Sequence, residues 1–165
     1  MRIHLRTAAL DDVAFLADVV MTATLAQRRF PQDVDPVNYR AGYEEWTRDT
    51  ILGVIPDCTL SVIEYNGLPV GRLRVVRTQS SITLAGIQLL PAYQNWRIGS
   101  TLIEELKREA DCKQVPLFIS VEKDNPRAQR LYERLGCRRI GQDEQEYHLE
   151  YRPAPGNEGA SPGSD

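Results

Sequence analysis

The segment that constrains the fold most is residues 116–121, where Ser120 is the one polar residue. A strand with one face in water alternates apolar and polar residues, whereas this run is apolar on both faces. Such a strand belongs inside a sheet. Because segments with helical periodicity stand on both sides of it in the sequence, we predict an α/β or α+β sandwich built on a mixed sheet.

Hydrophobic periodicity divides the rest of the chain into helices and strands. Apolar residues recur at helical spacing in four segments, and strand-like runs occupy six. Asn66-Gly67 between two of these runs predicts a tight hairpin, since both residues tolerate positive φ. The helices are expected over residues 11–28, 37–52, 98–112 and 125–135, and the strands over residues 59–65, 70–76, 82–90, 116–121, 138–141 and 146–151.

The chain of 165 residues has the length and hydrophobic content of one domain. We place that domain at residues 1–152. Residues 153–165 are rich in Pro, Gly and Ser and cannot bury apolar surface, so we expect a disordered C-terminal tail.

Charge and composition exclude several classes of function. A net charge of −3 gives no reason to expect nucleic acid as a partner. No run of about twenty apolar residues occurs, which predicts neither a signal peptide nor a membrane span and makes the cytoplasm the expected location.

The sequence has too few histidines and cysteines at suitable spacings to indicate a metal site or a disulfide framework. His4 and His148 are far apart, and Cys58, Cys112 and Cys137 are odd in number and widely spaced. That spacing fits neither a disulfide framework nor a paired zinc-ligand pattern. We therefore expect no metal site and three reduced, structural cysteines.

The most informative segment is residues 89–100, a strand that stops at Pro91 and turns through a polar loop into a helix. Such a turn directs backbone N–H groups and a positive helix end at one point, which is an anion site. Gly99, which has no Cβ, would let a phosphate approach the backbone closely. The spacing matches neither of the glycine-rich fingerprints of NAD or ATP proteins.

This segment resembles motif A (Q/R-x-x-G-x-G/A) of the GCN5-related N-acetyltransferases, the GNAT family, with Gln94 and Gly99 on its first and last positions. Three further resemblances follow the family order: Leu5 to Ala8 with Asp12 and Leu16, Gly67 to Gly71, and Asn125 to Cys137. They imply a GNAT-like α/β fold, with the order β-α-α-β-β-β-α-β-α-β-β and a mixed, mostly antiparallel central sheet flanked by helices.

The resemblance implies acetyl-CoA as the cosubstrate. Its pantetheine arm would pair with the strand edge near Leu89 and Leu90, and Asn125 would contact the CoA arm, although Asn125 also suits a simple N-cap. The pyrophosphate would bind the backbone amides of the loop residues Gln94, Asn95, Trp96, Arg97, Ile98, Gly99 and Ser100.

Arg97 departs from the family pattern, because it stands where motif A has its first glycine. Either the loop keeps a negative φ at this position and the guanidinium adds a phosphate contact, or the cradle is impaired. We favour the first interpretation.

Acetyl transfer needs an acid, an oxyanion site and a base. The resemblance implies Tyr132 as the general acid, since a phenol of pKa about 10 stays protonated at neutral pH; a packing role is the alternative, as Tyr132 lies beside the apolar stripe Ala128, Leu131 and Leu135. The backbone N–H of Leu89 is the expected oxyanion donor.

The general base is not assigned, because no carboxylate or histidine occurs between Ile82 and Leu90. By strand position Glu64, Glu122 and His148 are candidates, and we favour a chain of water molecules.

The acceptor site of this family is lined by the region that here holds Tyr39, Tyr43 and Trp46, with Glu44 nearby. Core packing is the alternative explanation for these aromatic residues. If the carboxylates of this helix border the acceptor site, they would favour a cationic amine.

We therefore expect an enzyme that moves acetyl to a primary amine of a small molecule or peptide by direct attack in a ternary complex. A non-catalytic sensor module that binds acyl-CoA, and an enzyme that binds ATP at the same turn, are the alternatives. The oligomeric state stays open, a homodimer included.

Overall fold

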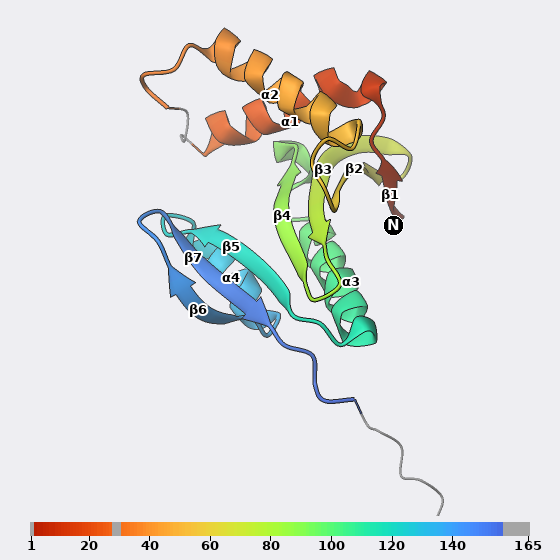
Figure 1. The fold of residues 1–165 in the computed structure, drawn as a ribbon. Helices are drawn as coiled ribbons and strands as arrows, with labels where there is room; N and C mark the ends of the chain where they lie inside the picture. Colours follow the sequence, from red (N-terminus) through yellow and green to blue (C-terminus); the bar gives the residue numbers. More distant parts are fainter. Residues whose placement is uncertain (1, 28–30, 157–165) are drawn as a thin grey trace, which may run out of the picture.

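The computed structural model describes residues 2–27 and 31–156, which form one seven-stranded sheet with helices packed on it (Figure 1). Short 3-10 turns, η1 (Leu10–Asp12) and η2 (Pro91–Tyr93), precede two of the helices. The helices are α1 (Val13–Ala26), α2 (Pro36–Ile51), α3 (Ile98–Lys113) and α4 (Pro126–Arg134). The strands are β1 (Ile3–Thr7), β2 (Cys58–Tyr65), β3 (Leu68–Arg77), β4 (Ile82–Leu89), β5 (Leu117–Glu122), β6 (Arg138–Gln142) and β7 (Glu146–Tyr151).

The sheet has the strand order β1-β2-β3-β4-β5-β7-β6. All neighbouring pairs are antiparallel except β4 and β5, which are parallel. This mixed, mostly antiparallel sheet with flanking helices, in the expected element order, confirms the predicted fold class.

The tight hairpin predicted at Asn66-Gly67 is confirmed, and β3 begins two residues earlier than expected. Asn66 has φ 50° and Gly67 has φ 85°, and β3 begins at the next residue, Leu68. Two consecutive residues with positive φ match the right-handed twist of the strands they join.

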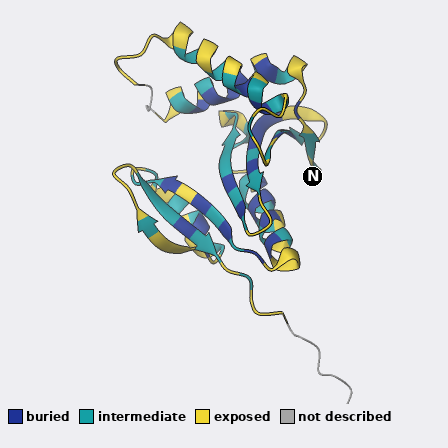
Figure 2. Ribbon diagram, viewed as in Figure 1, coloured by how far each residue is buried: buried dark blue, intermediate teal, exposed yellow. Residues whose placement is uncertain are grey.

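Two hydrophobic clusters lie on opposite faces of the sheet. The larger contains Ile98, Leu102 and Leu106 of α3 packed on the central strands, and the smaller contains Leu16 of α1 with Val62 of β2. Val62 and its neighbour Ile63 belong to different clusters, as the alternation of side chains along a strand requires. Burial is densest along these strands and on the inner sides of α1 and α3 (Figure 2).

The sheet opens in its middle. β4 pairs with β5 only over Ile82–Leu84 and Leu117–Ile119, and beyond these residues the two strands part (Figure 1). The register between β3 and β4 shifts at the same level, where Arg74 pairs with Gly86 and Val75 with Leu84. This irregularity is a bulge at Ala85, and a bulge bends the strand that carries it.

Several smaller expectations are also settled by the structure. Among the described residues no helix is long and apolar enough to cross a membrane. The three cysteines are free, but Cys112 is exposed rather than packed, because it lies on the outer side of α3. Residues 152–156 have no regular structure; residues 28 and 157–165, which the sequence assigned to a helix end and to the tail, lie outside the described residues.

Candidate active site

The opening between β4 and β5 holds a cavity of about 750 Å³. Residues of β4 and β5 line it from the two sides, and residues of α1, α2, β3, α4 and β7 also contribute to its walls. A second cavity of about 440 Å³ lies at the start of α3. Gln27, Asn125 and Ala128 line both cavities, so the two adjoin.

Free backbone N–H groups face this region from the loop before α3. No acceptor within the described chain takes a hydrogen bond from the N–H groups of residues 95–100, whereas the N–H of Gln94 donates to Pro91 O. The expected set of amides is therefore present without that of Gln94. The Gln94 side chain has another task, since its Nε2 donates to Leu89 O at 3.2 Å and ties the loop to β4.

Arg97 has φ 60° and ψ 13°, so the expectation of a negative φ at this position was wrong. Asn95 is also left-handed, with φ 70°. A loop that enters a helix directly from a short turn requires these angles, which glycine adopts freely and other L-residues adopt at a cost of about 1 kcal/mol. Arg97 thus keeps the backbone path that a glycine would take, and it lines the smaller cavity.

Gly99 is not required by packing. A Cβ built on it would meet only Ile87 Cδ1 among nearby atoms, at 3.9 Å, which is an ordinary contact. The residue lines the smaller cavity in the first turn of α3. The missing side chain therefore leaves space on the side of the helix end where free N–H groups and the positive dipole attract anions.

Trp96 points away from the cavities. Its ring, half exposed, packs at 5.6 Å from Tyr65 and 6.3 Å from Tyr93.

The edge of β4 that faces the opening can be read from its pairing with β3. Leu90 N donates to Val70 O, and Leu89 stands opposite Gly71. In an antiparallel ladder the N–H and C=O groups of Leu89 then point away from β3, as do those of Ile87 two residues earlier. The N–H of Leu90, which the sequence grouped with the cofactor contacts, is used within the sheet.

Tyr132 is the buried residue of α4 and lines the large cavity. It is 7% exposed, whereas Ala128, Leu131 and Leu135 of the predicted stripe are only partly buried. Burial, and to a lesser extent the charge of Glu122, raises the pKa of Tyr132 to about 12. The phenol is therefore protonated throughout the neutral range.

Asn125 is the N-cap of α4. Its Oδ1 accepts a hydrogen bond from Ala128 N at 3.2 Å. Because the residue lines both cavities, capping and ligand contact are compatible here.

The α2 residues proposed for the acceptor site separate into two groups. Tyr39 lines the large cavity, whereas Tyr43 and Trp46 pack against each other at 5.7 Å, outside its lining. Glu44 forms ion pairs with Arg40 at 3.0 Å and Arg48 at 3.7 Å. Its carboxylate is thus engaged along its own helix, which removes the reason to expect a cationic acceptor from Glu44.

The three candidates for the general base lie in different parts of the structure. Glu64 pairs with Arg6 at 3.0 Å on the β1 side of the sheet, while Glu122 lines the large cavity. His148 reaches that cavity through Ser120, whose Oγ lies 3.1 Å from His148 Nδ1.

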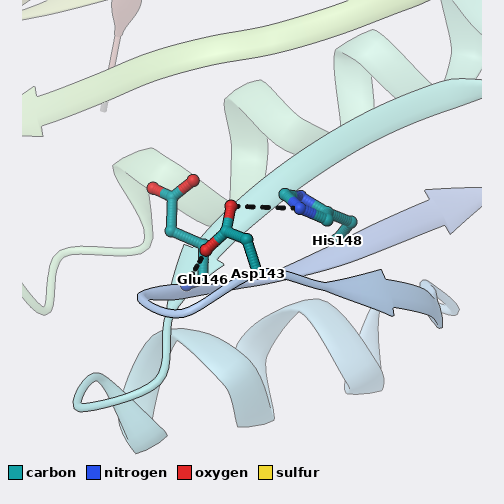
Figure 3. A group of neighbouring side chains, drawn as sticks. All are labelled: Asp143, Glu146 and His148. Carbon is teal, nitrogen blue, oxygen red and sulfur yellow. Dashed lines mark hydrogen bonds and ion pairs between the residues drawn. The ribbon is translucent and has the colours of Figure 1, made fainter.

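Asp143, Glu146 and His148 form a cluster at the β6-β7 turn, and their ligand-type atoms lie within 4.8 Å of one another (Figure 3). Asp143 lies 3.2 Å from His148 Nε2 and accepts hydrogen bonds from the backbone N–H groups of Gln145 and Glu146. These contacts close the β6-β7 turn and explain why the three residues lie together. Glu146 also lines the large cavity, and burial raises its pKa.

The family of this chain follows from comparison with known proteins. The model of the acetyltransferase (GNAT) family matches residues 20–137, a span that contains the loop, the opened strands and Tyr132. The chain belongs to the GNAT family. No curated protein sequence matches it.

Solved GNAT structures share the fold at low sequence identity. The PaiA N-acetyltransferase of Thermoplasma acidophilum, in complex with coenzyme A, is 17% identical, with a TM-score of 0.75 over 92% of this chain and 99% of that one. The ribosomal-protein-S18-alanine N-acetyltransferase of Escherichia coli is 17% identical, with a TM-score of 0.70 over 97% and 100%. The N-acetyltransferase PseH of Campylobacter jejuni, in complex with acetyl coenzyme A, is 15% identical, with a TM-score of 0.64 over 93% and 100%.

Sequence reasoning missed two features of this GNAT chain. The backbone groups of Ile87 face the opening because Ile87 lies two residues before Leu89 on β4. Sequence alone does not show this, because it depends on which β3 residue lies opposite each β4 residue. Glu146 begins a strand, where a charged residue ordinarily indicates solvent, and only the packing of β7 against β5 brings it to the cavity.

Proposed function

We propose that this GNAT chain is an acetyl-CoA-dependent N-acetyltransferase that acetylates a primary amine of a small molecule or peptide by direct attack in a ternary complex. The observation that carries the proposal is the set of free N–H groups of residues 95–100, all of which except Trp96 line a cavity adjoining the opening between β4 and β5.

These N–H groups and the dipole of α3 would hold the pyrophosphate of acetyl-CoA. Arg97, at the mouth of the smaller cavity, would add a charged contact. The pantetheine arm would take the place of a strand beside β4, where the backbone groups of Ile87 and Leu89 face the opening. Asn125 would contact the same arm.

Transfer forms a C–N bond and breaks a C–S bond. A neutral amine attacks the thioester carbon, and the carbonyl oxygen gains negative charge, which the N–H of Leu89 would stabilise. The thiolate then leaves and takes a proton from Tyr132, whose phenol is still protonated where a thiol of pKa about 8.5 titrates. The amine's proton would pass to water in the large cavity.

The sensor alternative rested on Arg97 as a sign of a damaged cradle. Since Arg97 adopts a left-handed backbone, which glycine also adopts freely, the arginine has not changed the conformation open to a glycine there, and the loop geometry supports a working cradle. Catalysis is therefore the better-supported function.

Calorimetric titration with coenzyme A and an acetyl-transfer assay with a panel of amines test the proposal. Gly99→Glu should abolish binding, because its carboxylate would face the phosphates, whereas the fold has room for a side chain there. Gly42→Glu, which adds the same charge at an exposed site of α2 with open space around it, should bind like the parent. Equal binding by both variants contradicts the proposed cradle.

A further inference from the structure

Side-chain polar atoms without a partner gather at one place in the fold. Within the described residues, four buried side-chain atoms lack a hydrogen bond: Tyr43 Oη, Arg72 Nε, Arg74 Nε and Gln88 Oε1. Buried polar atoms are ordinarily satisfied, so each such atom calls for an explanation. Here the residues are neighbours, because Arg72 stands opposite Gln88 in the sheet and its guanidinium lies 5.4 Å from the Tyr43 ring.

Arg72 carries a buried charge with no anion beside it. It is 4% exposed, and the described chain offers it no ion pair. Burial, and next the charge of Arg74, lowers the pKa of Arg72 to about 9. Two like charges placed together in a protein interior are unfavourable unless something compensates them.

Aromatic rings supply part of that compensation. Arg74 lies 4.7 Å from the centre of the Trp46 ring, and Arg72 lies 5.9 Å from it. Such contacts are attractive for a cation, but they use no N–H donor; within the described chain Arg74 Nη2 donates to Ala85 O at 3.4 Å, and the Nε atoms of both arginines have no acceptor. The aromatic rings thus stabilise the two guanidinium groups, while the Nε–H donor of each still has no acceptor.

The pair lies on the acceptor side of the large cavity. Arg72 and Arg74 alternate with the core residues Leu73 and Val75, so they point to the sheet face covered by α1 and α2 (Figure 1). Arg74 and Gln88 line the cavity. Gly86 lines it as well, and a Cβ there would lie 3.0 Å from Arg72 Nη2, so its glycine leaves room beside the guanidinium.

We propose that Arg74, which lines the cavity, binds a carboxylate of the acceptor and that the charge of Arg72 behind it strengthens this contact, so that the acceptor is a small amine that carries a carboxylate, such as a free amino acid. This inference rests on the proposed acetyltransferase function and names its substrate class. Guanidinium groups match the planar carboxylate with paired N–H donors. Gln88 lines the cavity, and its Oε1 is an acceptor suited to the amine. Donors and an acceptor together fit a molecule that bears both charges.

This substrate class replaces the cationic amine that the α2 carboxylates suggested. Glu44 is engaged by Arg40 and Arg48, whereas Arg74 lines the cavity and, like Arg72 beside it, has no ion pair within the described chain. A polyamine would add positive charge beside these two cations, which is unfavourable.

Matched acceptors test the proposal. The rate of acetyl-CoA consumption is measured with a set of amino acids, their carboxamides, their decarboxylated amines and the corresponding aminophosphonates. We expect kcat/KM for the best amino acid to exceed that of its carboxamide by about tenfold or more, since a site built for a charged group rejects the neutral analogue. A preference for the carboxamide, the plain amine or the aminophosphonate overturns the proposal.

Variants locate the preference. In Arg72→Met and Arg74→Met the ratio of amino acid to carboxamide should fall to about twofold or less, whereas Arg138→Met, at an exposed site of β6, should keep the parent ratio. Arg72→Met should be at least as stable as the parent in thermal unfolding, because it removes an uncompensated charge. If Arg72→Met does not fold, Arg74→Met alone decides, and a retained ratio in that variant overturns the proposal.

The two proposals fail differently. Coenzyme A that gives no heat of association removes the acetyltransferase function itself. Binding and transfer to amines with no carboxylate preference leave that function intact and remove the substrate class.

Discussion

At the scale of single residues, Arg97 stands where the family motif has a glycine and has a left-handed backbone that glycine adopts freely. The sequence predicted the loop and the departure from glycine, but not the sign of φ, because φ is fixed by the path from η2 into α3 rather than by the side chain. Nothing local in the sequence distinguishes an arginine in that path from one in an extended loop.

An Arg97→Gly variant should unfold in urea at nearly the parent free energy. The glycine relieves a left-handed arginine of about 1 kcal/mol, which offsets the added freedom of the unfolded chain. The same exchange at Arg108, an exposed interior position of α3, should cost about 1 kcal/mol. Equal losses at both positions would mean that the backbone at Arg97 is not strained.

Tyr132→Phe should lower the turnover number about a hundredfold or more without weakening coenzyme A binding, since it removes a proton donor and keeps the packing. In the parent, the rate should rise with pH as the amine loses its proton. It should then stay level to about pH 10, because the pKa of Tyr132 is raised to about 12. Full turnover by the variant across this range would show that the tyrosine only packs.

At the scale of elements, the sequence predicted most of what positions the site. The bounds of β4, α3 and α4 were expected within a few residues, because proline, glycine and asparagine mark their ends. Periodicity fails for Arg72 and Arg74: their alternation with apolar residues is typical of a solvent face, but the packing of α2 buries Arg72 and partly covers Arg74.

Variants of Asn125 can separate its role as the N-cap of α4 from its proposed contact with coenzyme A. Asn125→Ala should lose about 1 kcal/mol of unfolding free energy and weaken coenzyme A binding, while Asn125→Asp should keep the cap and weaken binding through its charge. Asp35→Ala removes the matching cap of α2, where Asp35 accepts from Val37 N, and should cost similar stability with binding unchanged. Parent-like binding by both Asn125 variants would leave only the capping role.

At the scale of the whole molecule, the opening of the sheet is what sequence could not predict. It depends on how few residues of β4 and β5 pair and on the bulge at Ala85, both of which are set by contacts distant in sequence. Tyr132 lines the large cavity and Leu89 the smaller one that adjoins it, and no local pattern in the sequence indicated either cavity.

Coenzyme A should stabilise the folded protein against heat, and ATP should not. At about 100 times Kd a ligand adds about 2.7 kcal/mol, which for a domain of this size raises Tm by about 5–10 °C. Thermal unfolding with each ligand measures this difference. An equal rise with ATP would favour the nucleotide-binding alternative.

Amide hydrogen exchange with and without coenzyme A tests the cradle most directly. The N–H groups of residues 95–100 have no acceptor in the described chain, so they should exchange fast in the free protein and become protected in the complex. Tight binding that leaves the exchange of these amides unchanged would contradict the account.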